Sequence, residues 1–170
     1  MFWSFEMLAV IYRQLYKDTK KKFEKSGKLA PYALLFTSKM HIEPGQKNLD
    51  FGEFTVPVEV ITSQYGSSLE VPINNEDDES KFRSFEAIQV LAESVEADCM
   101  LTVGEVWVKT VNIDLTDPKV EEAIQFSFQT KDGAYQAQIP IMRKGKKVKL
   151  PSAPPPLEPT EVLGGTSKVF

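Results

Sequence analysis

Apolar and polar residues alternate most clearly between positions 124 and 141. Every second residue there is apolar, the positions between them include glutamine and serine, and Asp132-Gly133 divides the run in two. An Asp-Gly step between two alternating runs is typical of the tight turn of a β-hairpin. The pattern therefore predicts two antiparallel strands with one apolar and one polar face. Pro140 has no amide hydrogen to donate, which predicts that the second strand lies at a sheet edge.

Two other segments follow the helical period. Apolar residues recur every three or four positions over residues 2–26 and again over residues 82–97. Gly27 gives the first helix a C-terminal stop, and the acidic run before the second complements the positive end of the helix dipole. Both segments are therefore predicted to be helices. Residues 65–75, which are broken by glycine and proline, predict a loop.

Three further stretches predict strands, at residues 33–42, 54–60 and 99–111. The last is long and rich in β-branched residues, as a central strand would be, whereas Pro57 makes the second an edge strand or an irregular extended segment. The elements together predict an α+β domain over residues 1–150. We expect a mainly antiparallel sheet of four to five strands with two helices packed on one face.

The composition fits one globular domain and excludes several classes of protein. Of the 170 residues, 42% are hydrophobic and 26% are charged, which is ordinary for a single domain. Cys99 is the only cysteine, so the small disulfide-stapled secreted proteins are excluded. Glu6 interrupts the apolar N-terminus, and no window holds the roughly 20 apolar residues of a transmembrane helix. These features predict a cytoplasmic protein with no membrane partner.

The composition changes after Leu150. Residues 151–170 are rich in proline and then contain two adjacent glycines, so they are predicted to form a tail that belongs to no core. The PxxP spacings of this tail can dock into an aromatic groove of a partner, and the chain end can dock onto a neighbouring subunit. We favour a spacer or a disordered end, because Val148 stands where a basic residue is expected before the first proline. The candidate partner-binding residues of the tail are Pro154, Pro155, Pro156 and Phe170.

The formal net charge of −4 is distributed unevenly. Lysine and arginine crowd residues 13–28 and 143–149, while carboxylates outnumber cations between positions 43 and 98. Basic clusters can contact nucleic-acid phosphates. However, the chain as a whole is acidic and lysine-rich helix ends are common on solvated surfaces, so nucleic acid is not the partner that we expect.

One segment resembles a known kind of protein. The stretch from Ile88 to Trp107, a predicted helix leading into a strand with a Glu-x-Trp step, is similar to a pattern in small uncharacterised bacterial and phage proteins. The run that begins at Glu121 and the step from Pro140 to Arg143 resemble the downstream part of the same pattern. The resemblance implies a helix, a strand and a hairpin, and it implies no activity.

Glu105 and Trp107 are candidate ligand-binding residues. Alternation places both on the same side of their predicted strand as Leu101 and Val103. A carboxylate on an apolar face is costly unless it is paired, and such a group suits acid–base chemistry or ligand anchoring. The alternative is that this face turns outward at the end of the strand. His41, from another strand, is a third candidate.

No catalytic constellation, metal-ligand spacing or phosphate loop is present in the sequence. His41 is the only histidine, and no second nucleophile motif accompanies it. Asp98 beside Cys99 favours an inert, buried thiol. The acidic run at residues 74–79 lacks the ligand spacing of a calcium loop, and helix capping explains it. We therefore expect no catalytic residue, no cofactor and no metal.

The leading hypothesis is a non-enzymatic binding or assembly protein, phage-associated or accessory. Homo-oligomers could form through the tail, through an edge strand near Pro140 or through the apolar residues Phe2-Trp3. The first alternative is a small enzyme with a pocket around Glu105 and Trp107. The second alternative is nucleic-acid binding through the two lysine clusters.

Overall fold

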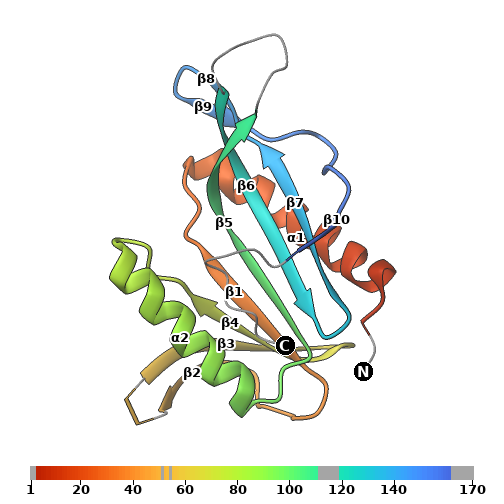
Figure 1. The fold of residues 1–170 in the computed structure, drawn as a ribbon, viewed down its shortest axis with the longest axis vertical. Coiled ribbons are helices and arrows are strands. Elements are labelled where there is room, and N and C mark those ends of the chain that lie inside the picture. The colour runs from red at the N-terminus through yellow and green to blue at the C-terminus, as the bar shows by residue number, and fades with distance from the viewer. Residues whose placement is uncertain (1–2, 51, 54, 111–118, 162–170) are drawn as a thin grey trace.

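The computed structural model describes residues 3–50, 52–53, 55–110 and 119–161 (Figure 1). The helices are α1 (Phe5–Ser26) and α2 (Asp78–Ser94). The longer strands are β1 (Tyr32–Thr37), β2 (Gly45–Asp50), β3 (Thr55–Ser63), β4 (Gly66–Pro72), β5 (Cys99–Thr110), β6 (Lys119–Thr130) and β7 (Gly133–Pro140). Three short strands follow, namely β8 (Met142–Lys144), β9 (Lys147–Lys149) and β10 (Glu158–Thr160).

Eight of the strands form one antiparallel sheet, in the order β10-β7-β6-β5-β1-β4-β3-β2, and β8 pairs with β9 alone. The α+β class and the antiparallel sheet are thus confirmed, but the expected count of four to five strands is too low. The sequence pattern missed β2, β4 and β10. Of these, β4 lies in the stretch predicted to be a loop, and β1 and β3 pair with it from either side. β3 is the hairpin neighbour of β4, whereas β1 is distant in the sequence, and pairing on both sides stabilises a strand whose own residues favour turns.

The two helices cover opposite faces of the sheet, not the same face as expected. In β1, Leu34 and Phe36 belong to the core cluster that contains α1, whereas Ala33 and Leu35 belong to the cluster that contains α2. Since consecutive side chains of a strand point to opposite faces, each helix has its own face (Figure 1). The run of five buried residues that ends at Thr37 requires this double cover.

Both helices begin and end where the sequence predicts, within a few residues. The Ser4 hydroxyl accepts a hydrogen bond from the amide of Met7, and Gly27 ends α1 in the left-handed conformation. The Asp77 carboxylate caps α2 by accepting from the amide of Ser80 at 2.7 Å. In the described part of the chain, neither helix is long and apolar enough to cross a membrane.

The predicted hairpin is formed by β6 and β7, but β7 is not an edge strand. β10 pairs with the outer side of β7 over residues 134–136. Pro140 lies at the far end of β7, beyond this pairing, so its missing amide hydrogen does not disturb a ladder. Pro57 is tolerated in the same way, because β4 pairs with β3 only from Glu59 onward.

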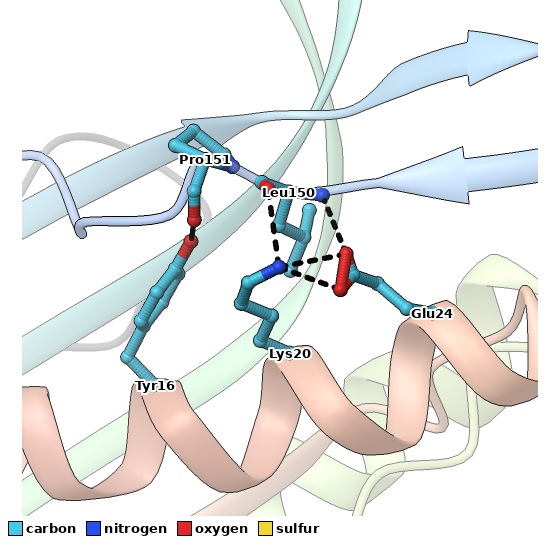
Figure 2. Close-up of polar contacts among 5 residues, drawn as sticks. All are labelled: Tyr16, Lys20, Glu24, Leu150 and Pro151. Carbon is cyan, nitrogen blue, oxygen red and sulfur yellow. Dashed lines mark hydrogen bonds and ion pairs between the residues drawn. The ribbon is translucent and has the colours of Figure 1, made fainter.

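The proline-rich segment packs along α1, so the expectation that it belongs to no core does not hold for residues 151–160. Leu157 is 5% exposed and lies in the same core cluster as α1. The hydroxyl of Tyr12 donates to the carbonyl of Pro155 at 2.7 Å, and the hydroxyl of Tyr16 donates to that of Pro151 (Figure 2). A polyproline-like chain satisfies none of its carbonyls internally, and these donors from the helix do so. Pro154 and Pro155 are half-buried and Pro156 is exposed, while Phe170 lies outside the described residues.

Candidate functional site

An open groove of about 640 Å³ lies on the α1-side face of β1, β4, β3 and β2. It lies on the part of that face toward β2, the strand at the end of the sheet. The residues that line it are Ala30, Pro31, Tyr32, Gln46, Lys47, Asn48, Pro57, Val58, Glu59, Glu70 and Pro72. Three prolines and the ring of Tyr32 supply rigid apolar surface, and two carboxylates supply charge.

The two carboxylates lie directly opposite each other. Glu59 of β3 is the register partner of Glu70 of β4. Directly opposed side chains of antiparallel strands share one face and start about 5 Å apart at their Cβ atoms. Like charges in that position destabilise a sheet, so this pair is not explained by folding alone.

Charged side chains of α1 interact with this pair of carboxylates. Asp18 and Lys22 form an ion pair at 3.0 Å, and Lys22 also interacts electrostatically with Glu70 and Glu59. Burial and then the charge of Glu59 raise the pKa of Glu70, while Lys22 opposes this shift without cancelling it. Glu70 is therefore a half-buried carboxylate whose charge is only partly compensated.

Tyr32 forms the wall between α1 and the carboxylates. Burial raises its pKa to about 12, while a hydrogen bond with the Thr19 side chain acts in the opposite direction. Thr19 is itself buried on α1. The phenol is therefore neutral at physiological pH and fixed in position, where it offers an aromatic surface beside the negative charges.

The lining of the groove offers carboxylates, amides and an aromatic ring as its chemical groups. No histidine, cysteine or serine lines the groove, and among the described residues no group of three or more metal-ligating side chains is found. Facing carboxylates beside an aromatic ring can hold an organic cation, such as an ammonium or guanidinium group.

Glu105 and Trp107 do not line this groove. Both side chains are exposed, Trp107 by 71%, although Leu101 and Val103 on the same side of β5 are buried. Neither residue lines the second hollow, of about 440 Å³, which lies between α2 and strands β3 and β4. The face thus turns outward at the end of the strand, as the alternative interpretation held.

His41 is distant from Glu105 and Trp107. β1 ends at Thr37, so His41 lies after the strand in an irregular exposed segment. Phe36 pairs with Cys99 at the beginning of β5, whereas Glu105 lies beyond the residue that pairs with Tyr32. His41 and Glu105 are therefore near opposite ends of the β1–β5 pair, and the structure does not bring them together.

Cys99 has the inert setting that the sequence indicates. Its side chain is fully buried, and burial followed by the charge of Asp98 raises the pKa of the thiol. Asp98 accepts hydrogen bonds from the amide and the hydroxyl of Ser38, at 2.8 and 2.6 Å. The carboxylate therefore fixes the chain after β1 and does not activate the thiol.

The sequence could have indicated only one of the two groove carboxylates, Glu59. Alternation of Val56, Val58 and Val60 places Glu59 on the face opposite these valines. Glu70, however, lies in the stretch that reads as a loop, and its pairing with Glu59 depends on the register of β3 and β4. The two-residue connection Gln64-Tyr65 fixes that register, but it carries none of the usual turn residues that would reveal a hairpin in the sequence.

The comparisons with known proteins add no assignment. No family model matches the sequence, and no match was found among curated proteins or solved structures.

Proposed function

We propose that this chain is a non-enzymatic binding protein that holds a cationic organic group of its partner, an ammonium or a guanidinium, in the groove beside α1. The observation that carries the proposal is the direct opposition of Glu59 and Glu70 on the groove floor. A bound cation would receive hydrogen bonds from both carboxylates and would relieve their mutual repulsion.

The protein's own cations leave this site incompletely neutralised. Lys22 of α1 interacts electrostatically with both carboxylates, but it is already paired with Asp18. Lys47 lines the groove, but it alternates with Gln46 and Asn48 in β2 and so points toward the other face of the sheet. The charge balance therefore favours a positively charged ligand.

The volume supports a small ligand or one side chain of a larger partner. Binding pockets for small molecules typically span about 300–1,000 Å³ and combine apolar walls with a few polar groups. The groove, at about 640 Å³, lies within that range. A lysine or arginine side chain of a protein partner fits the same chemistry and agrees with the assembly role that the sequence favours.

The first alternative, an enzyme around Glu105 and Trp107, receives no support from a cavity, since neither residue lines either described hollow. The oligomer contact expected at Phe2-Trp3 also loses support. Trp3 is 4% exposed and packs on Phe36 and Tyr65, and Phe2 lies outside the described residues.

The proposal is tested by calorimetric titration with two simple probes, spermidine and arginine amide. We expect both to bind the natural protein. The variants Glu59→Gln and Glu70→Gln should each weaken binding by at least about tenfold, because a hydrogen bond to a charged group contributes about 1.5–3 kcal/mol. Glu86→Gln on α2 is the matched control, since Glu86 is exposed and does not line the groove. Absence of binding by either probe, or an equal loss in Glu86→Gln, would contradict the proposal.

A further inference from the structure

The two lysine clusters, which are far apart in the sequence, lie together in the fold. β9 contacts α1, and Leu150, the residue after β9, is held on the helix (Figures 1 and 2). The amide of Leu150 donates to Glu24 at 3.3 Å, and the ammonium group of Lys20 lies 3.4 Å from the Leu150 carbonyl. These contacts fix the β8–β9 hairpin beside the C-terminal half of α1.

This arrangement creates one basic surface at that end of the molecule. The ion pairs there use other cations, namely Lys20 with Glu24, Lys22 with Asp18 and Arg143 with Glu122. The lysines that remain are all exposed and have no ion pair within the described part of the chain. They are Lys17, Lys21, Lys25 and Lys28 on and after α1, and Lys144, Lys146, Lys147 and Lys149 on the hairpin.

An exposed aromatic side chain borders this basic surface. Trp107 of β5 lies directly opposite Glu122 of β6, and Glu122 binds the guanidinium of Arg143 in β8. Arg143 in turn pairs with Val148 of β9, the strand that contacts α1. A row of three side chains therefore leads from the exposed indole of Trp107 through Glu122 to Arg143, next to the lysines of the hairpin. The charge of Glu122 is neutralised by Arg143.

We propose that this surface binds single-stranded nucleic acid, with the phosphate backbone along the eight lysines and a base stacked on Trp107. Grooves or faces that combine lysines with an exposed aromatic ring are the usual design for single strands. A duplex keeps its bases stacked on one another and would leave the indole unused. Glu105, on the same side of β5, repels phosphates and directs the backbone toward the lysines.

A membrane of anionic lipids is negatively charged, as nucleic acid is, but it is the less favoured partner. A helix that binds a membrane surface inserts its apolar face into the lipid, but the apolar face of α1 is buried against the sheet. The proposal is also independent of the groove, since none of the eight lysines and neither Trp107 nor Arg143 lines it.

The test is fluorescence anisotropy with a labelled oligothymidylate of about 15 nucleotides, over a salt range of about 50 to 200 mM. We expect binding that weakens with salt. Each phosphate contact contributes about 0.7 to the slope of log affinity against log salt for single strands. Lys146→Glu with Lys147→Glu, and separately Lys21→Glu with Lys25→Glu, should each reduce the slope by about 1.4. Lys39→Glu with Lys131→Glu changes the charge equally at exposed sites on other segments and should change the slope little.

Trp107 gives the test a second readout. Trp3 is buried, so quenching of tryptophan fluorescence by the oligonucleotide would report on Trp107. We expect quenching, about a tenfold loss of affinity in Trp107→Ala, and tighter binding in Glu105→Gln.

Three results would overturn the proposal. One is no binding even at the lowest salt. Another is an equal loss of slope in the Lys39/Lys131 control, which would indicate a general effect of net charge. The third is binding to vesicles of anionic lipid with no binding to the oligonucleotide.

Discussion

Glu59 and Glu70 are the residues on which the function of the groove depends, and they should make the free protein less stable than it could be. A directly opposed pair of like charges costs up to about 1 kcal/mol in a sheet. Residues that are retained at such a cost are expected at binding sites, where activity and stability conflict. Replacing one of these two carboxylates is therefore expected to raise the free energy of unfolding, whereas most substitutions lower it.

The variant Glu70→Gln should stabilise the protein without ligand by about 0.5 kcal/mol, because it removes the repulsion from Glu59. Urea denaturation at neutral pH measures the effect, and Glu86→Gln is the control of equal chemistry at an exposed site. A clear loss of stability in Glu70→Gln would show instead that attraction to Lys22 outweighs the repulsion.

The stabilising effect of Glu70→Gln should depend on pH. The pKa of Glu70 is raised in the folded protein by burial and by Glu59. Between the ordinary value of 4.5 and the raised value, the folded state binds more protons than the unfolded chain, so stability from this group falls as the pH rises. The difference between Glu70→Gln and the natural protein should therefore be small near pH 4 and should grow toward neutral pH. Denaturation curves across this range would contradict the assignment if the difference shrank.

At the scale of elements, the segments that could be predicted are those whose signals are local. The hairpin of β6 and β7 follows from alternation around Asp132-Gly133, and both helices follow from their period and caps. β4 and β10 could not be predicted, because glycine, serine and proline become strands there only through distant partners. The opposite placement of the helices was missed although the continuous apolar run from Ala33 to Phe36 is typical of a strand that is covered on both faces.

The segment after β9 is the element that departs most from its sequence pattern. Leu157 is buried against α1, whereas its neighbour Pro156 is exposed. We therefore expect Leu157→Ala to destabilise the protein by about 2–3 kcal/mol, as buried leucine truncations do, and Pro156→Ala to have little effect. Urea denaturation of both variants tests this. Equal stability of the two would mean that the segment behaves as a free tail.

At the scale of the whole molecule, β1 joins two layers into one structure. The α1 side of the sheet centres on β5, β6 and β7, and the α2 side centres on β3 and β4, with β1 contributing to both cores. Since the cores share β1 and its neighbour β5, which places Leu101 in one core and Met100 in the other, they should not unfold separately.

Leu35→Ala on the α2 side and Leu101→Ala on the α1 side should each cost about 2–5 kcal/mol. Both side chains are fully buried. Each variant should lower the midpoint of a single unfolding transition. The transition is followed by circular dichroism and by tryptophan fluorescence, to which the buried Trp3 of the α1 core contributes. Two separate transitions in either variant would contradict a single cooperative domain.

The central claim is that the groove between α1 and β2 receives a cation, and a titration followed by nuclear magnetic resonance tests it most directly. Arginine amide added to isotope-labelled protein should shift the backbone signals of groove residues, Tyr32, Asn48 and Glu70 among them, in one saturable process. The same titration of Glu70→Gln should produce these shifts only at much higher concentration. Saturable shifts that fall elsewhere, or none at the groove, would contradict the account.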